Sequence, residues 1–581
     1  MDSQNVEFTS TAKLQSWKEA AAEKKRRQVL SIPKEWVLSN LPSKEEVNVV
    51  GFPEACGLLT SREIEITNSE VDILLQKLAT GAWSSVDVTT AFSKRAIIAH
   101  QLVNCLTEIF IGRALQRAAE LDEYLKTNGK PIGPLHGLPI SLKDQVSIKG
   151  LESTIGYVSC IGRYASKNAV LADILESCGA VLYVKTNVPQ TLMWVETYNH
   201  IFGRTLNPHN RTLTAGGSSG GEGALIALRG SPLGVGSDIA GSIRVPAAFN
   251  GLYALCPSPG RVPYAGCVNT LEGQDSILSS LGPLSSSLSG IKAFLKSVAS
   301  QKPWLKDPLA INKPWNEDEY QLADHGNGKR LCFAIMWHDE FILPQPPVTR
   351  ALEATKQALL AAGHQVIDWK PFKHPDIFQA LWVIWSAGAS EDFGTATALS
   401  GEPLVTTMEP DGDNLDSLSP SAPEDRPLPR GLSAYELWQE QKKRRQLREE
   451  YLAHWNATIT LTDTGRPVDA IVSPCAPFVA PPHGKNNLPP SYTMIWNALN
   501  YATLVLPTGL LANPSIDVRK PPHAFFTDLD KATYDFYDPA RCAGAPISVQ
   551  LVGRTSEEEA LIAMGEIVDV ALKTKVVPAK L

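Results

Sequence analysis

The stretch from Gly216 to Pro246 constrains this chain most. It contains two glycine-flanked serines, Ser218 and Ser242, which lie 24 residues apart (242 − 218). Glycine has no Cβ and adopts positive φ readily, so backbone N–H groups at such sites can approach a small polar group closely. Backbone N–H groups gathered around a hydroxyl are how an oxyanion hole is built. The pattern therefore favours a serine nucleophile within a buried site.

Three other interpretations fit these glycines less well. A flexible Gly/Ser linker is disfavoured because apolar residues such as Leu225, Ile226 and Ile243 would bury the region. A phosphate-binding Walker loop needs a lysine after the glycines, and the glycine spacing of a dinucleotide fingerprint is also missing. A nucleophile elbow needs a buried strand before the serine, and residues 211–215 make a poor one. The interpretation that remains is a serine hydrolase that does not use a nucleophile elbow.

A serine nucleophile needs a base, and two candidates lie upstream. Apolar and other side chains alternate over residues 138–143, which predicts a short strand with Lys143 at its C-terminal end. His136 precedes this strand. A lone lysine is usually a solvated surface group, and a histidine between prolines is usually a loop residue. The residue types alone therefore leave the base open, with the loop interpretation preferred for His136.

Three motifs in this order resemble the amidase signature family. They occupy Leu138–Asp144, Gly216–Gly223 and Asp238–Arg244. The resemblance implies a Ser-Ser-Lys triad, in which Lys143 is the base, Ser218 the bridging serine and Ser242 the nucleophile. It spans nearly the whole chain, and within the family it is strongest to fungal acetamidase-type and general amidases.

The resemblance also implies roles around the triad. The oxyanion hole is expected from the backbone N–H groups of Ile239, Ala240, Gly241 and Ser242. Substrate is expected to contact Met193, Trp194, Gly217 and Ser218. Structural support is expected from Ser219, Asp238 and Arg244. Two positions depart from the common family pattern, since Ala240 stands where glycine is usual and Ser237 where threonine is usual.

Composition excludes several classes of protein. The 581 residues are 43% hydrophobic and 20% charged, with a net charge of −7 and no long basic block, so a nucleic-acid partner is not expected. No apolar run reaches the ~18 residues of a membrane span. The nine cysteines lack any Cys-x-x-Cys pair, which is typical of free thiols in a reducing compartment. No histidine spacing typical of metal binding occurs, so neither a metal nor another cofactor is expected.

The N-terminus carries no signal-peptide pattern, which favours a cytoplasmic location. The last residues, Ala579-Lys580-Leu581, nearly match a Ser-Lys-Leu peroxisomal address and give the alternative location. The expected partners are a small-molecule amide and, as an option, a second copy of the chain in a homodimer.

Helix and strand patterns predict an α/β fold. A helical segment at 168–177 between strands at 138–143 and 180–185 is typical of a βαβ unit. The prediction is one large domain over residues 81–581, with a central mixed sheet wrapped by helices and an N-terminal helical arm over 1–80. The proline-rich, acidic composition of residues 401–430 predicts a mobile insertion.

These features predict an amidase that converts a carboxamide to a carboxylic acid and ammonia or an amine through an acyl-enzyme. The expected substrate is a small acetamide-like amide or a secondary-metabolite amide. One alternative is an amidotransferase subunit that supplies ammonia, and another is a non-catalytic binding protein on the same scaffold. The long arm favours a stand-alone enzyme, and the complete triad argues against a binding protein.

Overall fold

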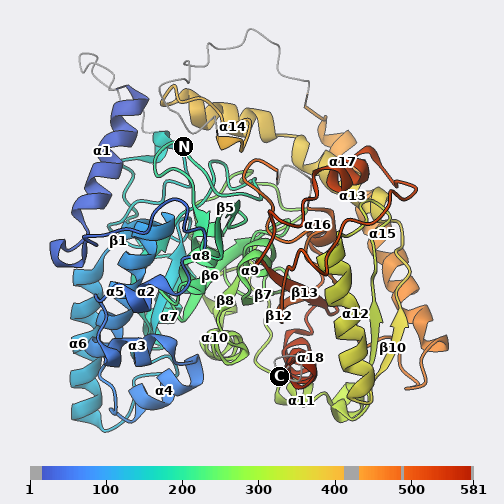
Figure 1. Ribbon diagram of the computed structural model, residues 1–581, viewed down its shortest axis with the longest axis horizontal. Coiled ribbons are helices and arrows are strands. Elements are labelled where there is room, and N and C mark those ends of the chain that lie inside the picture. Colours follow the sequence, from blue (N-terminus) through green and yellow to red (C-terminus); the bar gives the residue numbers. More distant parts are fainter. Residues whose placement is uncertain (1–15, 411–430, 486–489, 577–581) are drawn as a thin grey trace.

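An eleven-stranded sheet crosses the molecule and is wrapped by helices (Figure 1). This computed structural model describes residues 16–410, 431–485 and 490–576. The strand order is β1-β3-β2-β6-β8-β7-β12-β13-β11-β9-β10, and β4 and β5 form a separate two-stranded sheet. The strands are β1 Leu106–Ile109, β2 Pro139–Lys143, β3 Val181–Thr186, β4 Leu206–Asn207, β5 Asn210–Thr214, β6 Leu233–Asp238, β7 Tyr253–Cys256, β8 Ser280–Ser285, β9 Cys332–Ile335, β10 Gln365–Asp368, β11 Ala470–Pro474, β12 Thr503–Leu511 and β13 Pro546–Val552.

The helices vary from single turns to the 24 residues of α15. They are α1 Trp17–Leu30, α2 Phe52–Ala55, α3 Ser61–Asn68, α4 Val71–Ala79, α5 Ser85–Val103, α6 Ile111–Asn128, α7 Val170–Ser177, α8 Gly220–Ala227, α9 Arg244–Asn250, α10 Leu288–Ser300, α11 Glu317–Tyr320, α12 Pro346–Ala361, α13 His374–Ser386, α14 Ala389–Ala398, α15 Ala434–Ala457, α16 Ser491–Leu499, α17 Asp528–Phe536 and α18 Glu558–Val576. None of the helices in the described ranges is both long and apolar enough to cross a membrane.

Strand direction positions the motifs found in the sequence. β2 pairs in parallel with β3 and with β6, whereas β6 pairs antiparallel with β8. The carboxyl ends of parallel neighbours lie at the same edge of a sheet, where α/β proteins place their ligands. Lys143 at the end of β2 and Asp238 at the end of β6 therefore meet at one edge. The observed mixed sheet confirms the predicted α/β class.

One local expectation needs qualification. Residues 211–215 make a poor buried strand by sequence, yet residues 210–214 form β5. β5 pairs with β4 in the two-stranded sheet and not with the central sheet. A nucleophile elbow requires the serine to follow a strand of the central sheet. Ser218 follows β5, which is not part of that sheet.

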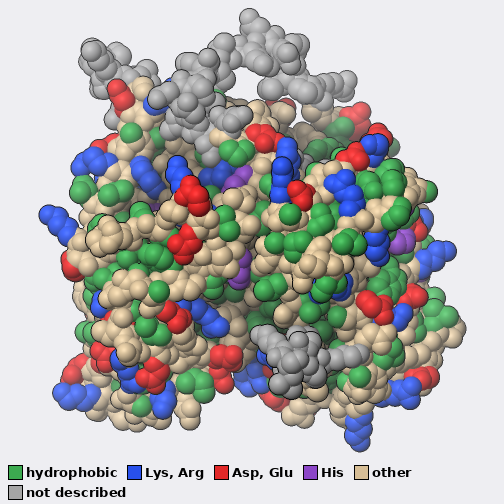
Figure 2. Space-filling model, viewed as in Figure 1, with side chains coloured by type: hydrophobic (Ala, Val, Ile, Leu, Met, Phe, Trp, Pro, Cys, Tyr) green, Lys and Arg blue, Asp and Glu red, His purple; other side chains and the backbone are tan. Residues whose placement is uncertain are grey.

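The predicted arm packs on the rest of the chain. Val71 and Leu74 of α4 belong to the same hydrophobic core as Phe92 of α5 and Ile291 of α10. At the start of the predicted insertion, Glu402 is 1% exposed and accepts a hydrogen bond from Gln190 (Nε2–Oε2 2.9 Å). The remainder of that insertion, 411–430, and the C-terminal Ala579-Lys580-Leu581 lie outside the described residues. On the described part of the face in Figure 2, acidic and basic side chains are interspersed.

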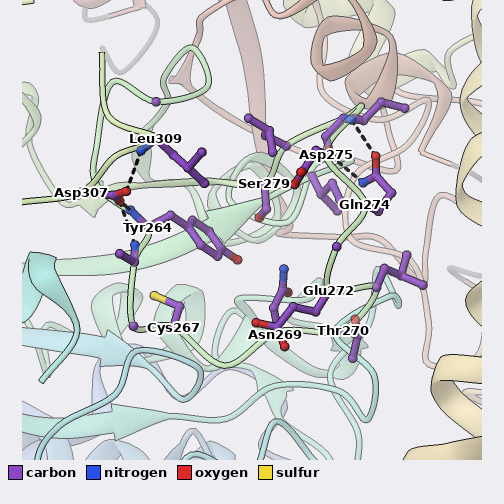
Figure 3. A pocket seen from close by; sticks show the side chains of 18 of the residues that line it. Tyr264, Cys267, Asn269, Thr270, Glu272, Gln274, Asp275, Ser279, Asp307 and Leu309 are labelled. Carbon is purple, nitrogen blue, oxygen red and sulfur yellow. Dashed lines mark hydrogen bonds between the residues drawn. The ribbon is translucent and has the colours of Figure 1, made fainter. Parts of the chain in front are cut away.

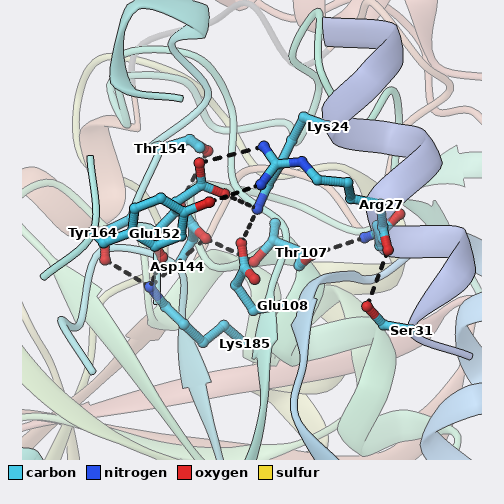
Figure 4. A network of polar contacts seen from close by, with 12 residues as sticks. Lys24, Arg27, Ser31, Thr107, Glu108, Asp144, Glu152, Thr154, Tyr164 and Lys185 are labelled. Carbon is cyan, nitrogen blue, oxygen red and sulfur yellow. Dashed lines mark hydrogen bonds and ion pairs between the residues drawn. The ribbon is translucent and has the colours of Figure 1, made fainter. Parts of the chain in front are cut away.

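A buried polar network ties α1 to the body of the protein (Figure 4). Lys24 Nζ forms ion pairs with Glu108 and Glu152, whose side chains are 15% and 1% exposed. Lys185 Nζ donates to the backbone oxygen of Glu152 (2.8 Å) and lies 3.9 Å from Asp144 Oδ1. The network therefore runs from α1 to the residue that follows Lys143.

We expect Lys24→Met to lower the free energy of unfolding by about 3–5 kcal/mol at pH 7, because it removes the ion-pair partner of Glu108 and leaves Glu152 with only the longer pair to Arg27 (3.4 Å). Burial raises the pKa of Glu108 even beside Lys24. A carboxyl group whose pKa is raised in the folded state stabilises the native state at low pH, and this contribution is lost as the pH rises. The difference in unfolding free energy between Lys24→Met and the wild type should therefore be smaller near pH 4.5 than at pH 7. Denaturant unfolding at both pH values measures this.

Arg26→Met is the matched control, since Arg26 lies on the same helix with 61% of its side chain exposed. Its unfolding midpoint should equal that of the wild type. Equal losses in the two variants would contradict a specific role for the buried network.

Candidate active site

Lys143 lies at the centre of the candidate site and is fully buried. Its Nζ donates to Ser218 Oγ (2.7 Å) and to Ser237 Oγ (2.8 Å). Burial lowers the pKa of Lys143 to about 7, although the carboxylates of Asp238 and Glu222 act in the opposite direction. Near neutral pH a large fraction of this amine is therefore unprotonated and able to accept a proton.

Ser218 stands in the loop between β5 and α8, after a cis peptide bond from Gly217. A Cβ on Gly217 would lie 2.6 Å from the backbone oxygen of Trp194, so only glycine fits there. The next residue, Ser219, is the N-cap of α8, and its N–H donates to the backbone oxygen of Ser242 (3.1 Å). This bond joins the two serine loops.

Ser242 stands in the loop between β6 and α9 and is 6% exposed. Its Oγ forms no hydrogen bond with any residue in the described ranges, which leaves the hydroxyl unengaged. The preceding Gly241 has φ +133°, and a Cβ there would lie 2.3 Å from Thr493 Oγ1. Glycine is thus required directly before the candidate nucleophile.

The four expected oxyanion donors are not equivalent. The N–H of Gly241 donates to Asp238 Oδ1 (2.8 Å) and is already engaged. Among the described residues, the N–H groups of Ile239, Ala240 and Ser242 have no hydrogen-bond acceptor. Ala240 avoids positive φ, so alanine is accommodated without strain where glycine is usual. Three of the four donors are therefore available to a ligand.

A buried ion pair holds this loop in place. Asp238 and Arg244 are both fully buried, and Arg244 Nη2 and Nε lie 2.8 and 3.0 Å from the two carboxylate oxygens. Asp238 also accepts from the N–H of Ile243 (3.0 Å). Burial acts to raise the pKa of Asp238, but the Arg244 charge and these hydrogen bonds lower it to about 2. Asp238 therefore stays ionised and braces the loop before and after Ser242.

Two of the four residues expected to contact substrate, Met193 and Trp194, pack in different places. Met193 packs against the same large buried cluster as Ile239 and Ala240 of the oxyanion loop. The side chain of Trp194 packs instead in a separate cluster with Tyr198, Val405 and Met408. The packing thus gives Met193 a cluster in common with the oxyanion loop, whereas the Trp194 side chain belongs to a different cluster.

The alternative base, His136, lies seven residues before Lys143, on the N-terminal side of β2. It is 2% exposed, and its Nδ1 accepts from the N–H of Ile132 (3.3 Å). Gly179 packs against its backbone. These contacts place His136 away from both serines.

Figure 3 shows a cavity of about 220 Å³. Ile239 of the oxyanion loop lines it, whereas Lys143, Ser218 and Ser242 do not. Its walls combine polar and apolar side chains, including Tyr264, Asn269, Thr270, Leu271, Ile277 and Ser279. The size and mixed walls of this cavity suit a small polar ligand, and Ile239 is its contact with the candidate site.

Sequence reasoning missed one buried contact of the site. Gln145 Oε1 accepts a hydrogen bond from Ser237 Oγ, and Gln145 Nε2 donates to Tyr264 OH (2.7 Å). Gln145 stands two positions after Lys143. No strand periodicity could have indicated this contact, because Gln145 lies in the turn after β2, where the N–H of Val146 donates to the backbone oxygen of Lys143 (3.0 Å).

Comparison with known proteins agrees with this geometry. A family model described as Amidase matches residues 87–562, most of the chain. The chain belongs to the amidase family. This amidase is 42% identical over 554 residues to an acetamidase from Aspergillus oryzae, covering 95% of this chain and 98% of the relative. It is 40% identical over 565 residues to an acetamidase from Emericella nidulans, covering 97% and 100%.

The solved structure of a fatty acid amide hydrolase superposes with a TM-score of 0.85 at 32% identity, covering 95% of this amidase and 94% of that chain. The amidase is therefore a single large α/β amidase-signature domain. It is a hydrolase that acts on carbon–nitrogen bonds of linear amides.

We expect Asp238→Asn to destabilise this amidase by about 3–5 kcal/mol, because it removes the partner of a buried charge. The amide NH₂ would also face an N–H donor of the loop. Activity should fall with stability, and thermal unfolding together with amide turnover measures both. Asp324→Asn, at an exposed carboxylate, is the control. A fully stable and active Asp238→Asn would show that the ion pair does not brace the loop.

Proposed function

We propose that this amidase hydrolyses small carboxamides through a Ser-Ser-Lys acyl-enzyme mechanism. The observation that carries the proposal is the buried Lys143 amine, whose pKa is lowered to about 7 by burial and which lies 2.7 Å from Ser218 Oγ. A neutral amine next to a serine hydroxyl is the base that a serine nucleophile requires.

In the proposed reaction, Ser242 Oγ attacks the amide carbonyl carbon, forming the C–O bond. Ser218 takes the proton of Ser242 and passes its own proton to Lys143. The N–H groups of Ile239, Ala240 and Ser242 stabilise the oxyanion. Ser218 then returns a proton to the leaving nitrogen as the C–N bond breaks. Water attacks the acyl-enzyme through the same proton path and releases the acid.

Ser242 Oγ has no hydrogen bond to Ser218 in the described structure, so the first proton transfer needs the two hydroxyls to approach. Hydrogen bonds of catalytic groups often tighten only when substrate is bound. We propose that binding of the substrate carbonyl oxygen to the oxyanion loop brings Ser242 Oγ within hydrogen-bonding distance of Ser218 Oγ.

Two observations support a small substrate. The cavity of about 220 Å³ beside Ile239 is below the range of about 300–1,000 Å³ usual for ligand pockets. Two relatives at 40% identity or more are acetamidases. We therefore propose an acetamide-like carboxamide as substrate. Mass-spectrometric product analysis over short aliphatic, aryl and long-chain amides tests this, and a clear preference for long acyl chains would refute it.

We expect Ser242→Ala to lose turnover while keeping its fold, since it removes the attacking oxygen. A fluorophosphonate or sulfonyl fluoride should label Ser242 in the wild type and leave this variant unlabelled. Peptide mass spectrometry locates the label, and circular dichroism checks the fold. A label found on Ser218 would reverse the assigned roles.

We expect wild-type kcat/KM to fall below about pH 7 in one protonation step, because Lys143 then gains a proton and stops acting as a base. Lys143→Ala should lose about 10²–10⁴-fold in rate. Lys143→Arg should fail as well, since arginine stays protonated in proteins.

His136→Ala is the comparison that decides the base, measured as single-turnover acylation. The histidine variant should keep its acylation rate. Loss of acylation in His136→Ala together with activity in Lys143→Ala would make the Ser-Ser-Lys mechanism wrong for this chain.

A further inference from the structure

Within the described part of the chain, Lys143 forms hydrogen bonds with two hydroxyl groups, and one of them lies on the proposed proton path. A neutral amine carries two N–H donors and one lone pair. Nζ lies 2.7 Å from Ser218 Oγ and 2.8 Å from Ser237 Oγ, so either hydroxyl is close enough to donate to the lone pair. The base works only if Ser218 is the donor. We propose that Gln145 enforces this choice, an inference that rests on the proposed function.

The side-chain amide of Gln145 has a single orientation. Its NH₂ group lies 2.7 Å from Tyr264 OH and 3.3 Å from the backbone oxygen of Val268. A backbone carbonyl can only accept, so the nitrogen must face Val268 and the oxygen must face Ser237. The main chain holds the same pair together, because the N–H of Val268 donates to the backbone oxygen of Gln145 (2.9 Å). Gln145 is fully buried, so solvent does not compete.

This orientation fixes the proton of Ser237. The amide oxygen of Gln145 only accepts, so the Ser237 hydroxyl donates to it. Ser237 is then left with lone pairs and takes an N–H from Lys143. Of the hydroxyls bonded to Lys143 in the described structure, Ser218 alone can deliver a proton to its lone pair. Gln145 acts through Ser237 and is a positioning residue.

Loss of the Gln145 oxygen has a specific chemical consequence. The Ser237 hydroxyl would be free to rotate and donate to the lone pair of neutral Lys143. That hydrogen bond would occupy the base with a hydroxyl that leads to no nucleophile. The defect therefore requires the Ser237 hydroxyl, which gives the inference a genetic test.

We expect Gln145→Met to lower kcat/KM by about tenfold to a hundredfold with KM little changed, less than the loss of a general base causes. Methionine keeps the side-chain length and removes both polar ends. Gln116→Met, at an exposed position of α6, is the matched control and should behave as the wild type. Unfolding midpoints and fluorophosphonate titration correct each rate for the folded, active fraction.

The decisive measurement is Gln145→Met in the Ser237→Ala background. Without the competing hydroxyl, adding Gln145→Met should not lower kcat/KM further than Ser237→Ala alone. The same fold-loss in both backgrounds would overturn the inference, because a purely structural defect does not depend on the Ser237 hydroxyl.

Gln145→Glu keeps the test informative if the methionine variant does not fold. Glutamate still offers Ser237 an acceptor oxygen, but a carboxylate there would raise the pKa of Lys143 and shift the pH profile. The comparison is therefore made on the alkaline plateau, where Lys143 is neutral and kcat/KM should stay within about threefold of the wild type. A loss as large as that expected for Gln145→Met would overturn the inference. Activity in Lys143→Ala would instead defeat the proposed function itself, so the two failures are distinguishable.

Discussion

Burial of the Lys143 amine is the constraint on which the site depends. Holding its pKa at about 7 and not 10.5 costs the folded state about 4 kcal/mol at pH 7 relative to a solvated lysine. A free carboxylate nearby would restore the charge, so each neighbouring acid has to be neutralised. Arg244 neutralises Asp238, and burial raises the pKa of Glu222 to about 8, so Glu222 is largely protonated at neutral pH. Hydroxyl groups are then left as the direct partners of the amine.

The sheet makes this arrangement possible because it brings distant segments to one edge. β2 and β6 are parallel neighbours, so the base and the loop that carries Ser242 emerge side by side. The bond from Ser219 to the backbone of Ser242 then fixes the second serine loop against the first. Backbone contacts therefore set the positions of both serines, and the tight glycine positions follow from the same close approach.

Much of this could be predicted from the sequence, because local patterns carry it. The strand ending at Lys143 and the glycine-flanked serines are local, and so are most helices. Contacts that depend on long-range packing could not be predicted. Gln145 meets Tyr264 across 119 residues, the Trp194 side chain turns into a cluster formed with residues after 400, and the Gly241 N–H is occupied by Asp238. No residue pattern along the chain encodes such pairings.

The pleat of the sheet explains how two buried lysines, Lys143 and Lys185, come to have different partners. Leu142 pairs with Lys185 and Lys143 pairs with Thr186 across β2 and β3. Successive side chains on a strand point to opposite faces, so the two amines lie on opposite sides of the sheet. Asp144 follows Lys143 and shares the face of Lys185, where Nζ and Oδ1 lie 3.9 Å apart. That face opens onto the ion pairs beneath α1. The sheet therefore separates the lysine that lies beside the ion pairs of α1 from the lysine whose partners are the serine hydroxyls of the candidate site.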